Sequence, residues 1–355
     1  MLIAGRAIQG AGGGGVILMV EMIVCDLVPL RDRGKFMGII FAVFAIGSSL
    51  GPFIGGAIAQ GATWRWVFWI NLPIAAVALF LPVAFLHVNY KSEQSTADRL
   101  SRIDYAGNII IIASVTAILI ALTYGGTPYS WSSWPVLMPL LLGFAGLGVF
   151  VAYESSGWCA EPMTPLHLFK NRTSAAAFYL TFVHSLFSFW TLYFLPVYFQ
   201  AVQLQGPTRS GVLLLPTVIV IVPGAMISGG ILSKFGRYRP LHFAAFALMA
   251  LVAGVFIILD QFSSVALHVC LQLIGGLGCG LTPSTLLLAT QAALPKKDTE
   301  SSSATWAFVR TFGTVWSVSV PVAIFNSCCL LPCYKGLDSL FSKSYSKSDC
   351  GCFWR

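Results

Sequence analysis

Charged residues are scarce in this sequence. Only 10% of its 355 residues are Asp, Glu, Lys or Arg, whereas a soluble globular domain carries roughly 25%. Hydrophobic residues make up 57% of the chain instead. This composition excludes an ordinary soluble protein if the apolar residues are gathered into runs of about 20, the length that crosses a bilayer as a helix.

The apolar residues are gathered in this way. Their runs lack the strict polar–apolar alternation of a membrane β-strand, and most exceed the roughly 9 to 11 residues that such a strand needs. A helix satisfies its backbone hydrogen bonds internally, as lipid requires. We therefore predict an all-α integral membrane protein with about ten transmembrane helices, near residues 2–28, 36–60, 66–87, 105–125, 135–153, 174–200, 211–233, 240–259, 265–290 and 303–326.

Several chemical motifs are also missing. The chain has no Walker A or HExxH string, and no two acids lie together deep within one predicted span. These absences argue against ATP-driven transport and against a membrane-embedded enzyme. Five of the nine cysteines follow Asn326, but without the paired spacing of a zinc site. We predict no catalytic residues, no metal and no cofactor.

Basic residues are divided unequally between the two sets of alternate loops. The poorer set holds only Arg65 and Arg209. Cytoplasmic loops are enriched in Lys and Arg, so the richer set is assigned to the cytoplasm and the first helix enters from outside. The net charge of +8 is then a topology signal, and we expect no nucleic-acid partner. The richer set holds Arg31, Arg33, Lys35, Lys91, Arg99, Arg102, Lys170, Arg172, Lys234, Arg237, Arg239, Lys296 and Lys297.

A glycine-rich string recurs at long period. Residues 8–15 (IQGAGGGG) are echoed by residues 273–280 (LIGGLGCG), and residues 27–29 by residues 293–295, both about 265 positions later. Each copy is followed by a basic turn. Chance similarity between glycine-rich helices is the alternative. A parallel duplication is typical of transporters built from two similar halves.

The second predicted span carries Gly47, Gly51 and Gly55 at intervals of four, with Gly56 alongside and Pro52 after Gly51. Glycine at this spacing gives a smooth face that a neighbouring helix can approach closely. Proline removes a backbone donor and crowds the preceding turn, so we expect a bend. Helix packing and a role in conformational change both remain open.

Several strings resemble a known family. Residues 47–56 (GSSLGPFIGG) and 64–73 (WRWVFWINLP) resemble the fifth-helix antiporter motif of fungal drug:proton antiporters with fourteen spans, within the major facilitator superfamily. Residues 5–12 (GRAIQGAG) are similar to that family's fourth-helix motif. Further similar strings are 104–107 (DYAG), 168–172 (LFKNR) and 195–200 (LPVYFQ). The resemblance covers about residues 2–326 and implies a major facilitator-type helical bundle.

The resemblance also implies a domain organisation. The ten spans would be the family's fourth to thirteenth, so we expect a transporter that lacks the first three helices and the last. Residues 1–90 would be the remainder of the N-terminal half, with three spans. Residues 91–173 would hold two central linking spans and residues 174–326 the five spans of the C-terminal half. A polar tail rich in Cys and Ser follows at 327–355.

Candidate coupling residues lie on the first span. The resemblance implies that Arg6 holds the position of an arginine associated with proton coupling, with Gln9 and Gly10 nearby; an Arg6 that reaches the outer surface is the alternative. Glu21 is the only acid well inside a predicted span. It lies about 22 Å along the helix from Arg6, too far for a direct pair. We expect Glu21 to have charged neighbours nearby in sequence, Asp26, Arg31 and Arg33, as a structural cluster or as a proton-binding group.

Arg310, in the last span, is the other intramembrane cation. Such a charge indicates a functional site, and a structural role at a helix interface is the alternative. The resemblance further implies a cytoplasmic gate loop whose salt bridges form in one conformation only, with a plain topology signal as the alternative. Its residues are Gly230, Lys234, Gly236 and Arg237.

The sixth span is rich in aromatic residues. We take Trp190, Tyr193 and Gln200 as candidates to line a cavity for bulky apolar cargo, and lipid-facing aromatics are the alternative.

The resemblance implies proton-coupled efflux of drugs, toxins or secondary metabolites by alternating access, with a small molecule, protons and the bilayer as partners. We expect the plasma membrane, with the vacuolar membrane as the alternative. A non-functional truncated fragment, or a transporter of a siderophore, an amino acid or another small solute, remains open.

Overall fold

The computed structural model describes residues 1–63, 65–85, 103–126, 128–156, 162–292, 294–295 and 298–327. Within them, ten helical segments are long and apolar enough to cross a membrane, each close to a predicted span. The predicted all-α membrane fold is therefore confirmed. The helices are α1 (Leu2–Leu27), α2 (Leu30–Gly61), α3 (Trp66–Trp69), α4 (Asn71–Phe85), α6 (Tyr105–Tyr124), α7 (Trp134–Ser155), α8 (Arg172–Ala201), α9 (Pro207–Phe235), α10 (Arg239–Val255), α11 (Val265–Leu281), α12 (Pro283–Ala292) and α13 (Thr299–Phe325).

Short polar or glycine residues set several helix ends. Asp104 accepts a hydrogen bond from the Gly107 backbone N–H at 2.8 Å and caps the start of α6. Gly236 ends α9 in the left-handed region, with φ of 65°, where a residue with a Cβ is strained. Pro283 begins α12 one residue after α11 ends, and these two helices form one span, Val265–Ala292. The helices α3 and α4 likewise form one span, Trp66–Phe85.

The chain forms two compact units that interleave distant segments. The first contains Met1–Met22, Arg102–Trp190 and Ala289–Arg355, and the second contains Ile23–Ser101 and Thr191–Leu288. This division differs in kind from the predicted one, which follows the order of the sequence and stays a prediction. The predicted Cys-rich tail, apart from Ser327, lies outside the described residues.

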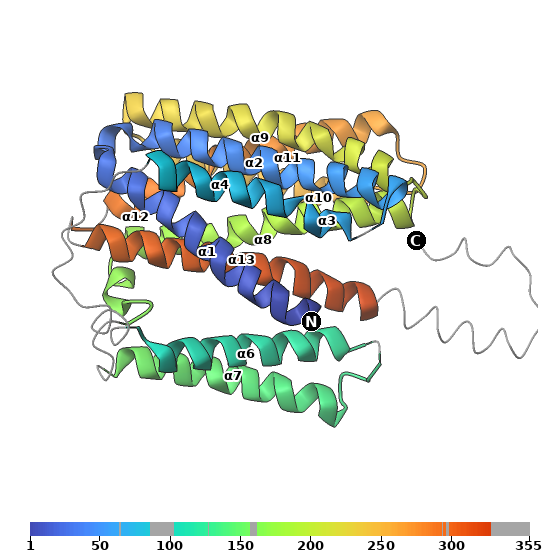
Figure 1. Cartoon of the computed structure of the whole chain (residues 1–355), viewed down its shortest axis with the longest axis horizontal. Coiled ribbons are helices and arrows are strands. Elements are labelled where there is room, and N and C mark those ends of the chain that lie inside the picture. The colour runs from blue at the N-terminus through green and yellow to red at the C-terminus, as the bar shows by residue number, and fades with distance from the viewer. Residues whose placement is uncertain are drawn as a thin grey trace, which may run out of the picture. The chain divides into compact units, whose positions relative to one another are not determined.

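In the second unit, α2 and α9 run side by side in opposite directions (Figure 1). Small residues allow the approach: a Cβ at Gly38 would lie 2.7 Å from the Ala225 carbonyl oxygen, and one at Gly211 would lie 2.7 Å from the Phe53 Cα. Without a strong hydrophobic force between helices in lipid, such close backbone packing is a main source of association. A side chain at either glycine would separate the pair.

The glycine-rich string of α11 packs in the same way against two neighbours. A Cβ at Gly276 would lie 2.7 Å from the Thr217 carbonyl oxygen on α9, and one at Gly278 would lie 2.9 Å from the Ala245 carbonyl oxygen on α10. The second copy of the sequence repeat is therefore a helix-packing element.

In the first unit, α6 and α7 form a hairpin (Figure 1). A Cβ at Gly143 would lie 2.8 Å from the Ser114 carbonyl oxygen, so the two helices are in close contact. At the predicted cytoplasmic end, the Tyr153 hydroxyl donates to Asp104 at 3.3 Å. The Glu154 carboxylate accepts from the backbone N–H groups of Met163 and Thr164. These buried acids are engaged in holding helix ends and a loop.

Contacts at helix ends and in loops agree with the predicted alternation of sides. At the predicted outer side, Thr208 donates to Gln60 at 2.5 Å, and the Tyr198 hydroxyl donates to the Asp260 carbonyl at 2.7 Å. At the predicted cytoplasmic side, His167 and Asp298 lie 3.5 Å apart. Each contact joins segments that the sequence assigns to the same side.

Candidate functional site

A buried ion pair joins α1 to α13 within the first unit. A guanidinium nitrogen of Arg310 lies 2.9 Å from a carboxylate oxygen of Glu21, and the two side chains are only 14% and 2% exposed. A single charge within a membrane span is expensive. Pairing removes most of that cost, because each charge then has its counter-ion at hydrogen-bond distance.

Arg310 is a partner of Glu21 that the sequence did not indicate. The sequence predicts charged neighbours at Asp26, Arg31 and Arg33, whereas the ionic partner in the structure is Arg310 on α13. Arg33 instead donates to the Val28 carbonyl at 2.9 Å, and the side chains of Asp26 and Arg31 lie outside the described residues. A charge cluster at this end of α1 stays a prediction. The contact with Arg310 could not be predicted from α1 alone, because the fold brings a distant helix to the acid.

The pair lies inside the spans, toward their predicted cytoplasmic ends. Glu21 precedes the end of α1 (Leu2–Leu27) by six residues, or about 9 Å. Arg310 follows the start of α13 (Thr299–Phe325) by eleven residues, or about 16 Å. Both positions are too deep for a side chain to be treated as a surface group.

The two charges differ in their remaining contacts. The Arg310 guanidinium also lies 4.8 Å from the centroid of the Trp306 ring, one turn earlier on α13, where a cation is attracted to the ring face. The second carboxylate oxygen of Glu21 has no hydrogen-bond partner among the described residues. A buried carboxylate with an open oxygen can accept a proton, and Arg310 retains a second favourable contact when it does.

Gly313 holds α13 against α8 one turn beyond Arg310. A Cβ at this position would lie 2.8 Å from the Phe182 carbonyl oxygen and 2.9 Å from the Ser185 Cβ. The Phe182 and Phe312 rings pack beside this contact, with centroids 6.0 Å apart. The position of Arg310 is thus fixed by close packing as well as by its charge.

The other coupling candidates lie apart from this pair. A guanidinium nitrogen of Arg6 donates to the Gln9 amide oxygen at 3.0 Å, with both side chains exposed. A Cβ at Gly10 would meet no atom within 4 Å. The structure brings Arg6 and Gln9 together, and the role of all three residues in coupling stays a prediction.

The glycines of the antiporter motif divide into two groups. A Cβ at Gly47, Gly51 or Gly55 would meet no atom within 4 Å, whereas one at Gly56 would lie 2.8 Å from the Pro207 carbonyl oxygen on α9. Among the described residues, Gly56 is therefore the one of the four that packs closely against another helix. Pro52 lies within the continuous helix α2, and a role of this face in conformational change stays a prediction.

The gate-loop candidates lie at the end of α9. Lys234 and Arg237 are exposed, and Gly236 has the positive φ that ends the helix. A Cβ at Gly230 would meet no atom within 4 Å. Gly236 thus has a structural reason to be glycine, and gating by this loop stays a prediction.

The cavity candidates are spread along α8. Trp190 and Tyr193 are 37% and 55% exposed, and the Gln200 amide donates to the Ser210 hydroxyl at 3.4 Å. Their contact with cargo stays a prediction.

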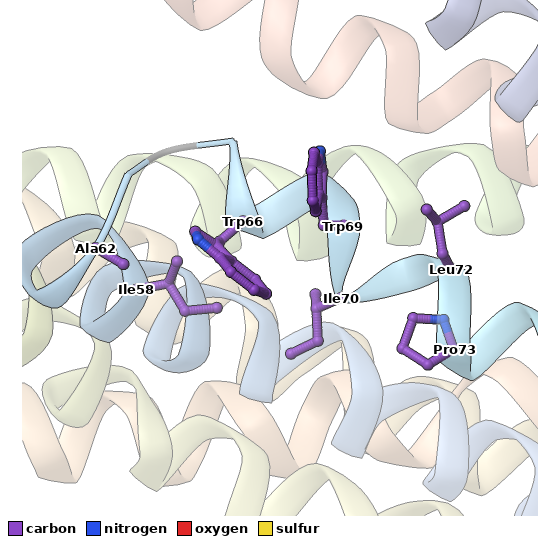
Figure 2. A pocket seen from close by; sticks show the side chains of 7 residues that line it. All are labelled: Ile58, Ala62, Trp66, Trp69, Ile70, Leu72 and Pro73. Atoms are coloured by element: carbon purple, nitrogen blue, oxygen red, sulfur yellow. The ribbon is translucent and has the colours of Figure 1, made fainter.

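A pocket of about 540 Å³ lies near the end of α2 and not on α8. The sequence analysis did not predict it, although the aromatic residues of the string WRWVFW cluster there in the sequence. Its lining residues are Ile58, Ala62, Trp66, Trp69, Ile70, Leu72 and Pro73 (Figure 2).

Within the described residues, ten apolar helical segments, two of them joined by a buried ion pair, define a polytopic membrane protein. Residues 1–318 match the family model of the Major Facilitator Superfamily. The chain belongs to this superfamily, as the resemblance implied.

Three relatives illustrate the similarity. The MFS-type efflux transporter ffsH of Aspergillus flavipes is 49% identical over 92% of this chain and 58% of its own length. The MFS-type transporter gkaD of Penicillium citrinum is 48% identical over 92% of this chain and 56% of its own. The MFS-type efflux pump LUC4 of a Fusarium species is 46% identical over 92% and 58%. The chain therefore spans less than two thirds of the length of the relatives it matches.

Proposed function

We propose that this chain forms part of a secondary active transporter that exports small molecules by alternating access. Two of the three relatives above carry efflux in their names, and the superfamily match covers residues 1–318. The cargo class we propose is drugs, toxins or secondary metabolites, with Trp190, Tyr193 and Gln200 as contacts. The proposed location is the plasma membrane, with the vacuolar membrane as the alternative.

The observation that carries the proposed mechanism is the Glu21–Arg310 pair. Separating α1 from α13 with both charges intact would leave two unpaired charges within the membrane, which is costly. A proton on Glu21 removes one charge, and Trp306 still contacts the guanidinium. Protonation of Glu21 thus lowers the free energy of the separated arrangement relative to the paired one. A ligand that favours one of two conformations shifts the equilibrium by its differential affinity, and here the ligand is the proton.

Coupling follows from the reciprocity of linked equilibria. If cargo favours one conformation and the proton favours the other, each lowers the affinity for the other by the same factor. The expected transport cycle is then an exchange of cargo for protons. Arg6 and Gln9 lie toward the predicted outer end of the same helix and are proposed to face the protons that enter from outside.

The direct test uses cells that express the full-length protein containing this chain. Accumulation of fluorescent apolar compounds is expected to fall relative to empty-vector cells, and an uncoupler is expected to restore it. Glu21→Gln should abolish the proton dependence, whereas Glu300→Gln, at an exposed acid in the first turn of α13, should leave it unchanged. Increased accumulation would indicate uptake of a solute, and no change with any cargo would favour a non-functional fragment.

A further inference from the structure

The pocket of about 540 Å³ is a site to which neither the ion pair nor the family assigns a ligand. It is formed by the end of α2, by α3 and by the start of α4 (Figure 2). Trp66 and Trp69 both line it, with ring centroids 5.7 Å apart and planes inclined by 50°. Its volume falls within the roughly 300–1,000 Å³ of small-molecule sites.

The chemistry of the lining selects a hydrocarbon ligand. All seven lining residues have apolar or aromatic side chains. Sites for polar small molecules normally add a few placed polar groups that fix the orientation of the ligand, and the described wall offers only the indole N–H groups. An alkyl chain requires no such group and can be held by apolar contact with the two indole rings.

The position of the pocket selects the bilayer as the source of that ligand. None of the residues of α3 and α4 is buried, although together they form an apolar span. Tryptophan is enriched at the boundary between hydrocarbon and headgroups. The pocket therefore opens on an apolar helix face at the depth where an acyl chain meets its headgroup.

Arg65 adds a charge that complements a lipid headgroup. It directly precedes Trp66, is exposed, and is one of only two cations in the loops assigned to the outer side. A guanidinium is a preferred donor to phosphate because its N–H groups match the phosphate oxygens in pairs. An apolar pocket, with an arginine next to one of its lining residues in the chain, matches the division of chemistry found in a phospholipid.

We propose that this pocket binds one phospholipid of the bilayer, with an acyl chain against Trp66 and Trp69 and the phosphate on Arg65. The site is separate from the proposed transport mechanism, so it can fail or hold independently of that mechanism. It predicts that a phospholipid remains with the purified chain when the loosely held lipids have been removed.

The experiment is native mass spectrometry of the full chain, with added phosphatidylglycerol or with diacylglycerol that has the same acyl chains. We expect one phosphatidylglycerol per chain, with at least about fivefold lower occupancy by diacylglycerol. Ala62→Phe fills the pocket and should reduce phosphatidylglycerol occupancy at least about fivefold, whereas Ala62→Ser should retain it. Trp69→Ala should reduce it, whereas the control Trp134→Ala should not. Trp134 is similarly exposed, at 70% against 60%, and begins another span on the predicted outer side.

The headgroup contact has its own pair of variants. Arg65→Gln should reduce phosphatidylglycerol occupancy to that of diacylglycerol, and Arg65→Lys should restore most of it. Helix content and gel-filtration profile establish that each variant is folded. Unchanged occupancy in folded Ala62→Phe, equal loss in Trp69→Ala and Trp134→Ala, or equal retention of the two lipids would overturn the proposal. Binding of an apolar dye that Ala62→Phe abolishes, with no phospholipid bound in the absence of the dye, would assign the pocket to cargo instead.

Discussion

The Glu21–Arg310 pair predicts a large energetic coupling between two helices that lie at opposite ends of the described chain. Two unit charges about 3–4 Å apart interact by about 4–6 kcal/mol at an effective dielectric constant of 20. Desolvation offsets part of this attraction, and removing one partner of a buried pair typically costs about 3–5 kcal/mol. Glu21→Gln leaves the cation with Trp306 at 4.8 Å and partial exposure, so we expect a loss at the lower end, about 3 kcal/mol.

A double-mutant cycle measures this coupling directly. Glu21→Gln and Arg310→Met are each expected to lower the free energy of unfolding in mixed micelles. The double variant should be less destabilised than the sum of the two by at least about 2 kcal/mol, because it leaves no buried charge behind. The exposed pair Asp32–Lys35, with side chains 47% and 59% exposed at 3.7 Å, is the control, for which coupling of at most about 0.5 kcal/mol is expected. Additivity within about 0.5 kcal/mol for Glu21 and Arg310 would refute the reasoning.

Three further substitutions probe helix packing in the first unit and a helix end and a hydrogen bond in the second. Gly313→Ala places a methyl group 2.8 Å from the Phe182 carbonyl oxygen and should lower the free energy of unfolding by about 1–3 kcal/mol in the same assay. The control Gly148→Ala, with no atom within 4 Å of the added methyl group, should be neutral or slightly stabilising. Equal effects of the two substitutions would contradict close packing at Gly313. Gly236→Ala forces a Cβ into φ of 65° and should lower the free energy of unfolding by about 1–2 kcal/mol. Tyr198→Phe removes the 2.7 Å hydrogen bond to a carbonyl and should cost about 1 kcal/mol, and an unchanged thermal midpoint would show that water replaces the hydroxyl.

The spans could be predicted because bilayer thickness and backbone satisfaction act on each apolar run separately. The same local reasoning identified Glu21 and Arg310 as intramembrane charges. It could not pair them, because their contact depends on how α1 and α13 pack, which no periodicity within either helix encodes.

Glycine spacing was informative about packing in general and less so about particular residues. The sequence drew attention to Gly47, Gly51 and Gly55, yet the close approach of α2 to α9 occurs at other small residues, among them Gly38. A spacing of four defines a face on a helix, but the neighbour that uses the face is chosen by the whole bundle. The lipid-sized pocket was missed for a related reason, since it requires the turn between α2 and α4 to fold back on the end of α2.

The central claim is that a proton on Glu21 couples cargo export to the proton gradient. It is tested by reconstituting the full-length protein containing this chain in inverted vesicles with an acidic lumen and measuring cargo accumulation. The wild-type protein should accumulate cargo until an uncoupler is added. Glu21→Gln should lose the gradient-driven accumulation and retain cargo exchange at equilibrium. Gradient-driven accumulation by Glu21→Gln at the wild-type level would contradict the claim.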